Sequence, residues 1–137
     1  MNSIKFGAIL TIALSMAFLG FSTLPGVNAS SGCWNVTASK WATNIFGLKL
    51  YQYDIGNQFC TNGSSITSVC CLYGNQYAWL GWSSRGHSES YYEGGVGQSY
   101  IGIHGNAHFA LQTLWWTNDQ YVDIYVWEHG DGSVTSA

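Results

Sequence analysis

YVDIYVW, residues 121–127, is the stretch that decides the fold class. In an extended chain Val122, Ile124 and Val126 fall on one face, and the polar or amphipathic residues between them fall on the other. This period of two is typical of a half-buried β-strand and differs from the 3.6-residue period of an amphipathic helix. The stretch therefore predicts a strand with one buried face.

The same alternation recurs through the rest of the chain, and no capped helix with a 3.6-residue apolar period is found after Cys33. Asn62-Gly63 is a tight-turn signal, and Gly105-Asn106 indicates either a two-residue turn or a bulge in one long bent strand. The sequence predicts an all-β fold, a small antiparallel sandwich or barrel of about six to eight short strands. The clearest predicted strands cover residues 48–53, 65–73, 76–82, 100–104, 107–116 and 121–127.

The first 29 residues have the pattern of a secretory signal peptide. Lys5 supplies the positive charge, residues 6–21 supply the apolar segment, and Val27-Asn28-Ala29 is a small-x-small cleavage site. An uncleaved anchor is the alternative, but the apolar run is shorter than the roughly 18 to 20 residues of a spanning helix. We expect cleavage before Ser30, a single secreted, extracellular domain over residues 30–137, and no membrane insertion once the leader is removed.

Four cysteines follow the predicted leader, and an even number in an oxidising compartment predicts two disulfides. A bond between adjacent Cys70 and Cys71 would close a strained two-residue ring. We therefore expect Cys33 and Cys60 each to bond one member of that pair, with both connectivities open. The alternative is a metal site, but the paired C-x-x-C spacing of such sites is missing.

Charge limits the class of partner. After the leader only Lys40, Lys49 and Arg85 stand against seven Asp and Glu residues. Nucleic acids and anionic membrane surfaces recruit clusters of Lys and Arg, so this composition argues against both as partners.

Aromatic residues exceed the needs of a small core, with seven Trp and nine Tyr in the chain. Neighbouring residues of a strand face opposite ways, so one member of Tyr91-Tyr92 and of Trp115-Trp116 should stay partly exposed. We expect Trp79, Trp115 and Trp127 in the core. The predicted surface and ligand-binding residues are Trp82, Tyr91, Tyr92 and Trp116.

Exposed rings beside amides and carboxylates are typical of sugar recognition, because a flat ring stacks on the apolar face of a pyranose. The leading functional hypothesis is a secreted, non-catalytic module that binds a glycan, a cell-wall polymer or the cell-envelope surface. A secreted protein-interaction factor, antimicrobial or enzyme-inhibiting, that uses the glycine-rich loop 91–98 is the alternative. The sequence leaves the oligomeric state open, together with glycosylation at Asn35 and Asn62.

Catalysis has weaker support in the sequence. His104 and His108 are four residues apart and, with His87, His129 or a carboxylate, would be needed for a metal-assisted hydrolase. Residues 84–89 place a serine, a histidine and a glutamate close in sequence, but triads are defined by geometry and no G-x-S-x-G elbow occurs. We therefore predict no catalytic residue, no resident metal and no cofactor.

Several short motifs follow one another along the predicted mature chain. They are Leu50-Tyr51-Gln52-Tyr53, Cys60-Thr61-Asn62-Gly63-Ser64, Ile66-Thr67-Ser68-Val69, Gly81-Trp82-Ser83, Gly86-His87, 94–99 and Gly130-Asp131-Gly132. Their order resembles that of small secreted bacterial proteins of the actinomycete type. That resemblance covers most of residues 30–137 and implies secretion, with no activity to assign to particular residues.

The stretch from Tyr73 to Trp79-Leu80-Gly81 has a second similarity, to the βγ-crystallin Greek key, but five residues separate Tyr73 from Trp79, where that signature has a shorter spacing.

Overall fold

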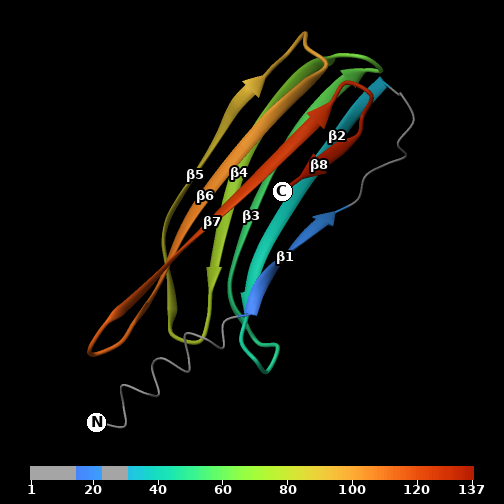
Figure 1. Ribbon diagram of the computed structural model, residues 1–137. Helices are drawn as coiled ribbons and strands as arrows, with labels where there is room; N and C mark the ends of the chain where they lie inside the picture. The colour runs from blue at the N-terminus through green and yellow to red at the C-terminus, as the bar shows by residue number, and fades with distance from the viewer. Residues whose placement is uncertain (1–14, 23–30) are drawn as a thin grey trace.

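Two four-stranded antiparallel sheets pack face to face in the computed structural model, which describes residues 15–22 and 31–137 (Figure 1). The N-terminal sheet contains β1 (Ser15–Ser22), β2 (Ser31–Thr43), β3 (Lys49–Asn62) and β4 (Ile66–Ala78). The C-terminal sheet contains β5 (Trp82–Gly94), β6 (Tyr100–Gln112), β7 (Thr117–His129) and β8 (Val134–Ser136). The predicted all-β fold is confirmed.

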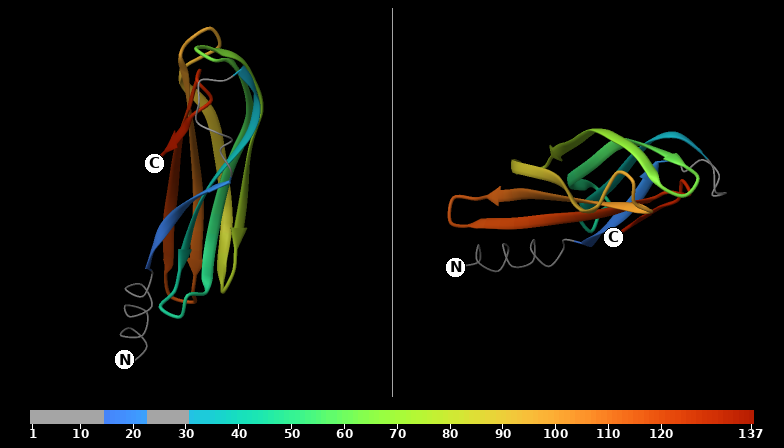
Figure 2. Two further views of the ribbon diagram at one scale, coloured as in Figure 1. Left: turned by 90° about the vertical axis from the view of Figure 1, so that its right-hand side faces the viewer. Right: turned by 90° about the horizontal axis from the view of Figure 1, so that it is seen from above.

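In each sheet the strands are ordered as they occur in the chain, and the turn from β4 to β5 leads from one sheet to the other. Figure 2 shows the two layers from the side and from above. The apolar alternation of β7 is used as predicted, since Val122, Ile124 and Val126 are all buried. They meet Ile55 and Phe59 of β3 in a core that both sheets contribute to.

The strands are longer than predicted, and β2 lies where no strand was expected. Most of β5 was not expected either, and this strand continues to Gly94, into the stretch 91–98 that was predicted as a glycine-rich loop.

The predicted interruption of β6 is also absent. The register of β6 with β7 runs without a shift from Tyr100 opposite His129 to Gln112 opposite Thr117. Gly105-Asn106 is thus neither a turn nor a bulge against β7. Glycine is needed at 105 for packing, because a Cβ there would overlap the Tyr53 hydroxyl and lie 2.6 Å from Ile55 Cγ2.

Gly105→Ala is expected to lower the free energy of unfolding by about 2 kcal/mol, because overpacking forces two sheets apart. Urea unfolding measures this loss. Gly63→Ala is not a suitable control, because Gly63 has a φ of 99°. Ser90→Ala, at an exposed position of β5, provides one and should change stability little. An unchanged midpoint for Gly105→Ala would show that the sheets pack less closely than described.

The disulfide pairing differs from the prediction. Cys33 bonds Cys60, its register partner across β2 and β3, and Cys70 bonds Cys71. The predicted pairing had excluded a bond between adjacent cysteines because of the strain of a two-residue ring. Cys71 has a φ of 66°, in the left-handed region, so the alternation stops there and both side chains are exposed.

Four tryptophans are placed differently from the prediction. Trp127 was expected in the core but lies, half-buried, on the outer face of the C-terminal sheet, where it stacks on Tyr125 and donates to Glu93. Trp82 was expected at the surface but is 7% exposed and packs on Tyr51, with ring centres 4.9 Å apart.

Trp79 and Trp115 were expected in the core but are 41% and 83% exposed. Trp115 lies in the turn between β6 and β7, where strand alternation no longer applies. Trp79 lies just after the end of β4 and continues the exposed face of that strand.

The predicted leader, residues 1–29, lies mostly outside the described residues. Its described part, 15–22, forms β1, which pairs with β2 from Ser15 opposite Thr43 to Ser22 opposite Thr37. Cleavage before Ser30 stays a prediction. It would remove β1 and leave β2 as the edge strand of the N-terminal sheet.

Candidate functional site

The outer face of β4 carries an exposed aromatic row. Tyr73, Asn75 and Tyr77 are exposed and alternate with residues that face the other sheet, such as Gln76. Gln76 Nε2 donates to His108 O at 2.9 Å, which shows that Gln76 faces the C-terminal sheet and that its neighbours Asn75 and Tyr77 face outward. Trp79 follows the strand end on the same side as Tyr77.

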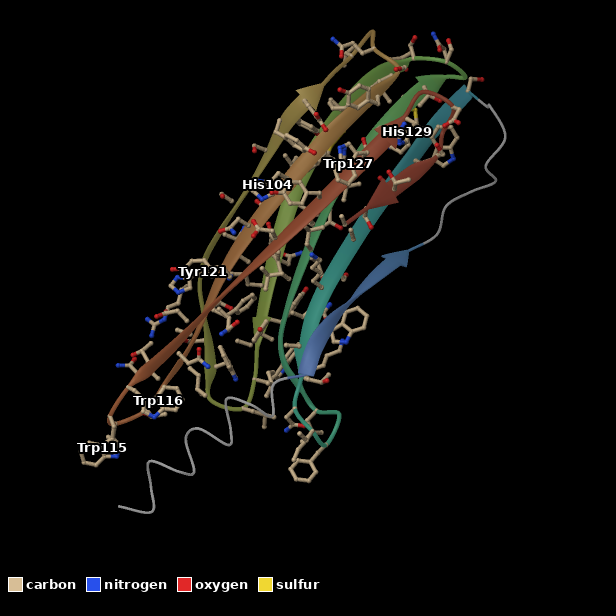
Figure 3. All side chains as sticks on the ribbon, viewed as in Figure 1. His104, Trp115, Trp116, Tyr121, Trp127 and His129 are labelled. Atoms are coloured by element: carbon tan, nitrogen blue, oxygen red, sulfur yellow. A yellow bond between two sulfur atoms is a disulfide. The ribbon has the colours of Figure 1, made fainter. Side chains whose placement is uncertain are left out.

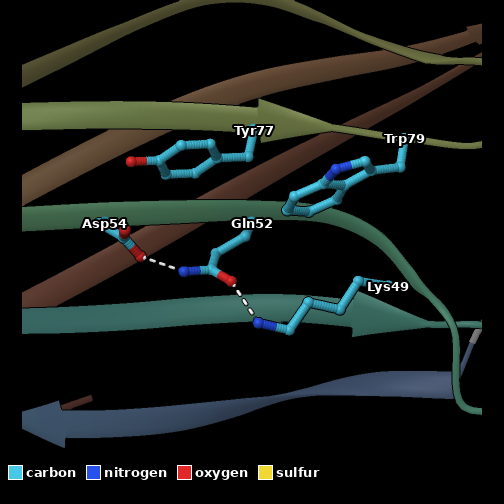
Figure 4. Close-up of a pocket in the computed structure, with 5 residues that line it drawn as sticks. All are labelled: Lys49, Gln52, Asp54, Tyr77 and Trp79. Atoms are coloured by element: carbon cyan, nitrogen blue, oxygen red, sulfur yellow. Dashed lines mark hydrogen bonds between the residues drawn. The ribbon is translucent and has the colours of Figure 1, made fainter.

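Tyr77 and Trp79 line a pocket of about 280 Å³ on this face, together with residues from the start of β3 (Figure 4). The two rings are nearly parallel, with an interplanar angle of 10° and centres 6.0 Å apart. At that separation the rings are displaced from a face-to-face stack. Ring surface therefore stays open toward the pocket. We call this set the aromatic pocket; its lining residues are Lys49, Gln52, Asp54, Tyr77 and Trp79.

The floor of the aromatic pocket is a hydrogen-bonded row along β3. Lys49 Nζ donates to Gln52 Oε1 at 2.6 Å, and Gln52 Nε2 donates to Asp54 Oδ1 at 2.8 Å. Lys49 also lies over the Trp41 ring, 5.2 Å from its centre. An ammonium has three donors and a carboxylate has two oxygens, so this row has capacity left for a ligand.

Tyr73 extends the aromatic row away from the pocket and across β3. Its hydroxyl shares a hydrogen bond of 2.8 Å with Thr37 Oγ1 on β2. The ring can lie this flat only because its register partner is Gly56, where a Cβ would lie 2.5 Å from the ring. The outer face of the N-terminal sheet thus offers rings along β4 and amides and a carboxylate along β3.

The outer face of the C-terminal sheet is also aromatic, and His104, Tyr121 and Trp127 are labelled in Figure 3. Rings on this face stack on one another. The His104 ring lies 4.4 Å from that of Tyr125, and the His108 ring 4.4 Å from that of Tyr121. These pairs face each other across β6 and β7, so one face of each ring is covered by its partner. Trp127 Nε1 donates to Glu93 Oε1 at 2.6 Å.

His104 and His108 on this face are each hydrogen-bonded to a different carboxylate. His104 Nε2 shares a 2.8 Å bond with Asp123, which also accepts from Asn106 Nδ2. His108 Nε2 shares a 2.7 Å bond with Asp119. Hydrogen bonds from Asn106 and His104 lower the pKa of Asp123 against the opposing effect of burial. Within residues 31–137 no three His, Cys, Asp or Glu side chains are placed to hold a metal ion.

The serine-histidine-glutamate stretch does not form a triad among its own residues. Glu89 Oε1 accepts from the Tyr53 hydroxyl at 2.6 Å and shares a 2.6 Å bond with His87 Nδ1. Burial and the bond to Glu89 raise the pKa of Tyr53. Arg85 instead donates to Gln112 Oε1 at 3.2 Å. The cluster joins the two sheets at their β3 and β5 strands.

The four predicted binding residues lie in four different places. Trp82 is in the core, Tyr91 is part-exposed on β5, and Tyr92 packs on the outer face of the C-terminal sheet against Tyr125. Trp116 lies in the turn between β6 and β7. The expected opposite orientation of Tyr91 and Tyr92 is found, but the four residues do not form one surface.

Part of the aromatic pocket could have been found from the sequence. Tyr73-x-Asn75-x-Tyr77-x-Trp79 has the period of a strand face, and Gln52-x-Asp54 has the same period. Because the prediction placed Trp79 in the core, it did not recognise these residues as one exposed face. β3 and β4 are joined at the predicted turn Asn62-Gly63, but the register that places Gln52 opposite Tyr77 does not follow from local alternation.

Comparison with known proteins finds no matching family model, no similar curated protein and no similar solved structure. Over the described ranges, the fold contains no helix with the length and apolar character that crossing a membrane requires.

Proposed function

We propose that the protein is a non-catalytic carbohydrate-binding module that binds a glycan or cell-envelope polymer at the aromatic pocket. The observation that carries this proposal is the pair of parallel, half-exposed rings of Tyr77 and Trp79 beside the hydrogen-bonded row on β3. Rings stack on the apolar face of a sugar, while amide, ammonium and carboxylate groups bond its hydroxyls.

The shape and charge of the pocket support a neutral glycan. Its volume is at the lower end of the range for ligand pockets, which suits one part of a longer polymer. Lys49 and Asp54 bring one charge of each sign. Among the residues that line this pocket Asp54 is the single carboxylate, whereas glycoside hydrolysis uses two, and this supports binding without cleavage.

The test is a pull-down of the protein on insoluble cellulose, chitin and peptidoglycan. The protein is used in the form in which its producing cells accumulate it. Retention on one polymer, released by the matching soluble sugar, is the expected result. Protein capture that soluble sugars do not displace would favour the protein-interaction alternative instead. In that case the proposal fails.

Trp79→Ala is expected to weaken retention about tenfold, because one stacking surface of the pocket is lost. Tyr121→Ala is the matched control, since Tyr121 is an exposed ring on the opposite sheet. The thermal midpoint of both variants is measured alongside. Equal losses of retention in the two variants would contradict the assignment of the pocket.

A further inference from the structure

The two ends of the sandwich differ in chemistry. The turns between β2 and β3, β4 and β5, and β6 and β7 lie together at the lower end of the molecule in Figure 1 and in the side view of Figure 2. Residues 44–48, 79–81 and 113–116 form these turns, and none of them is charged. We call this end the apolar end.

Large apolar side chains project from all three turns. Leu114 is 93% exposed, Trp115 83% and Phe46 80%. Figure 3 shows Trp115 at the tip of its turn, pointing away from the sheets. The remaining large apolar residues exposed in these turns are Ile45, Leu48, Trp79 and Leu80.

At the opposite end the turns are rich in glycine and serine and bond to each other. Gly97 N donates to Ile66 O at 2.7 Å, and Ile66 N donates to Gln98 O at 2.8 Å. Gly130 N donates to Ser99 O at 2.7 Å. These backbone groups therefore have partners within the fold, and among the described residues of that end no cluster of large exposed apolar side chains compares with the three turns.

The turns of the apolar end hold their shape by local hydrogen bonds. Asn44 Oδ1 accepts from Phe46 N at 2.9 Å and from Leu48 N at 3.1 Å. Thr113 Oγ1 accepts from Trp115 N at 3.3 Å and from Trp116 N at 3.2 Å. The side chains are thus presented by ordered backbone, which reduces the entropy cost of docking them.

Positive charge lies next to these turns. Lys49 opens β3 directly after the first turn, and Arg85 is held beside the third turn by Gln112. They are two of the three Lys and Arg residues between 31 and 137. Tryptophan and basic side chains are the residue types that favour the boundary between lipid headgroups and acyl chains.

We propose that the apolar end docks into the interface of a phospholipid bilayer, with the three turns reaching the boundary between headgroups and acyl chains. This inference goes beyond glycan binding and does not depend on it. The turns are separate convex tips, and fluid lipid fills the gaps between such tips, whereas a folded partner would need a matching surface. The low content of Lys and Arg weakens electrostatic attraction to anionic lipids, but it leaves the insertion of apolar side chains into the interface unaffected.

The experiment is flotation of the accumulated form of the protein with vesicles of phosphatidylcholine and phosphatidylglycerol. The double variant Leu114→Ser with Trp115→Ser should lower the vesicle-bound fraction about tenfold, because two inserted side chains are lost. Val96→Ser is the control, since Val96 is an exposed apolar residue of the opposite end and its loss should change nothing. Any part of the leader that remains attached contributes equally to all variants.

A second measurement reads insertion directly. Lipids with brominated acyl chains should quench tryptophan fluorescence of the unaltered protein, and should quench the double variant less. Because Leu114 and Trp115 do not line the aromatic pocket, the double variant should keep full retention on polysaccharide. The two proposals can therefore fail separately.

Three results would overturn the proposal. One is that the unaltered protein does not float with the vesicles of phosphatidylcholine and phosphatidylglycerol. Another is that Val96→Ser loses binding as much as the double variant does. The third is a concentration-dependent dimer, formed without lipid and abolished by the double variant, which would make a second copy the occupant of the apolar end.

Discussion

Glu128→Gln is expected to raise the free energy of unfolding by about 3 kcal/mol at pH 8 and to change it little at pH 4. Glu128 is fully buried, and burial raises the pKa of its carboxyl to about 7 although the hydrogen bond from Asn57 opposes this. Asn57 Nδ2 donates to Glu128 Oε2 at 3.2 Å across the two sheets. Glutamine keeps the size of the side chain and removes the charge.

The direction follows from proton binding. The unfolded carboxyl titrates near 4.5 and the folded one near 7, so between these values the folded protein binds more protons. The contribution of Glu128 to stability is therefore complete below pH 4.5 and is lost as the pH rises through 7. Tyr91 is 38% exposed, and its pKa is raised by partial burial and, more weakly, by the charge of Glu128.

Urea unfolding of both proteins at pH 4, 6 and 8 measures this effect. The difference between them isolates Glu128, because every other titrating group is shared. Asp119→Asn, a change at a carboxylate on the outer face, is the control and should not reproduce the gain at pH 8. Parallel stability curves for the unaltered protein and Glu128→Gln would contradict the burial of this carboxyl.

Replacing Cys33 and Cys60 together by Ser is expected to cost about 3.5 kcal/mol of unfolding free energy, since the bond closes a loop with a sequence separation of 27. Neither sulfur is in the buried core, so most of the loss is conformational freedom regained by the unfolded chain. Thermal or urea unfolding under oxidising conditions measures it.

Replacing Cys70 and Cys71 by Ser is the matched control. These residues are adjacent, so their bond closes almost no loop and its removal should cost much less. Peptide mapping of the oxidised protein should show Cys33 linked to Cys60. A link from Cys33 or Cys60 to the 70–71 pair, or equal costs for the two double variants, would contradict the pairing described.

The fold class could be predicted because alternation is a local property. Val122, Ile124 and Val126 share a face in any extended chain, and burying them needs only a second layer. The strand lengths could not be predicted in the same way. A glycine at position 105 locally indicates the end of a strand. Its presence is explained instead by Tyr53 of the other sheet, whose hydroxyl occupies the space that a Cβ at position 105 would need.

The aromatic pocket was only partly predictable. An excess of aromatic rings and their exposure at some surface followed from composition, and exposed rings are found. Their positions did not follow, because Trp79 and Trp82 are three residues apart and one lies outside and the other inside. The turn between β4 and β5 separates them and changes sheet, so the alternation of one strand cannot be carried into the next.

The most direct test of glycan binding at the aromatic pocket is a chemical-shift titration of the tryptophan indole N–H groups with the soluble form of the retained glycan. The proposal predicts that the Trp79 resonance moves in a saturable way and that those of Trp115 and Trp127 stay in place. Movement confined to Trp127, with Trp79 unchanged at saturation, would place the ligand on the opposite sheet and contradict the proposal.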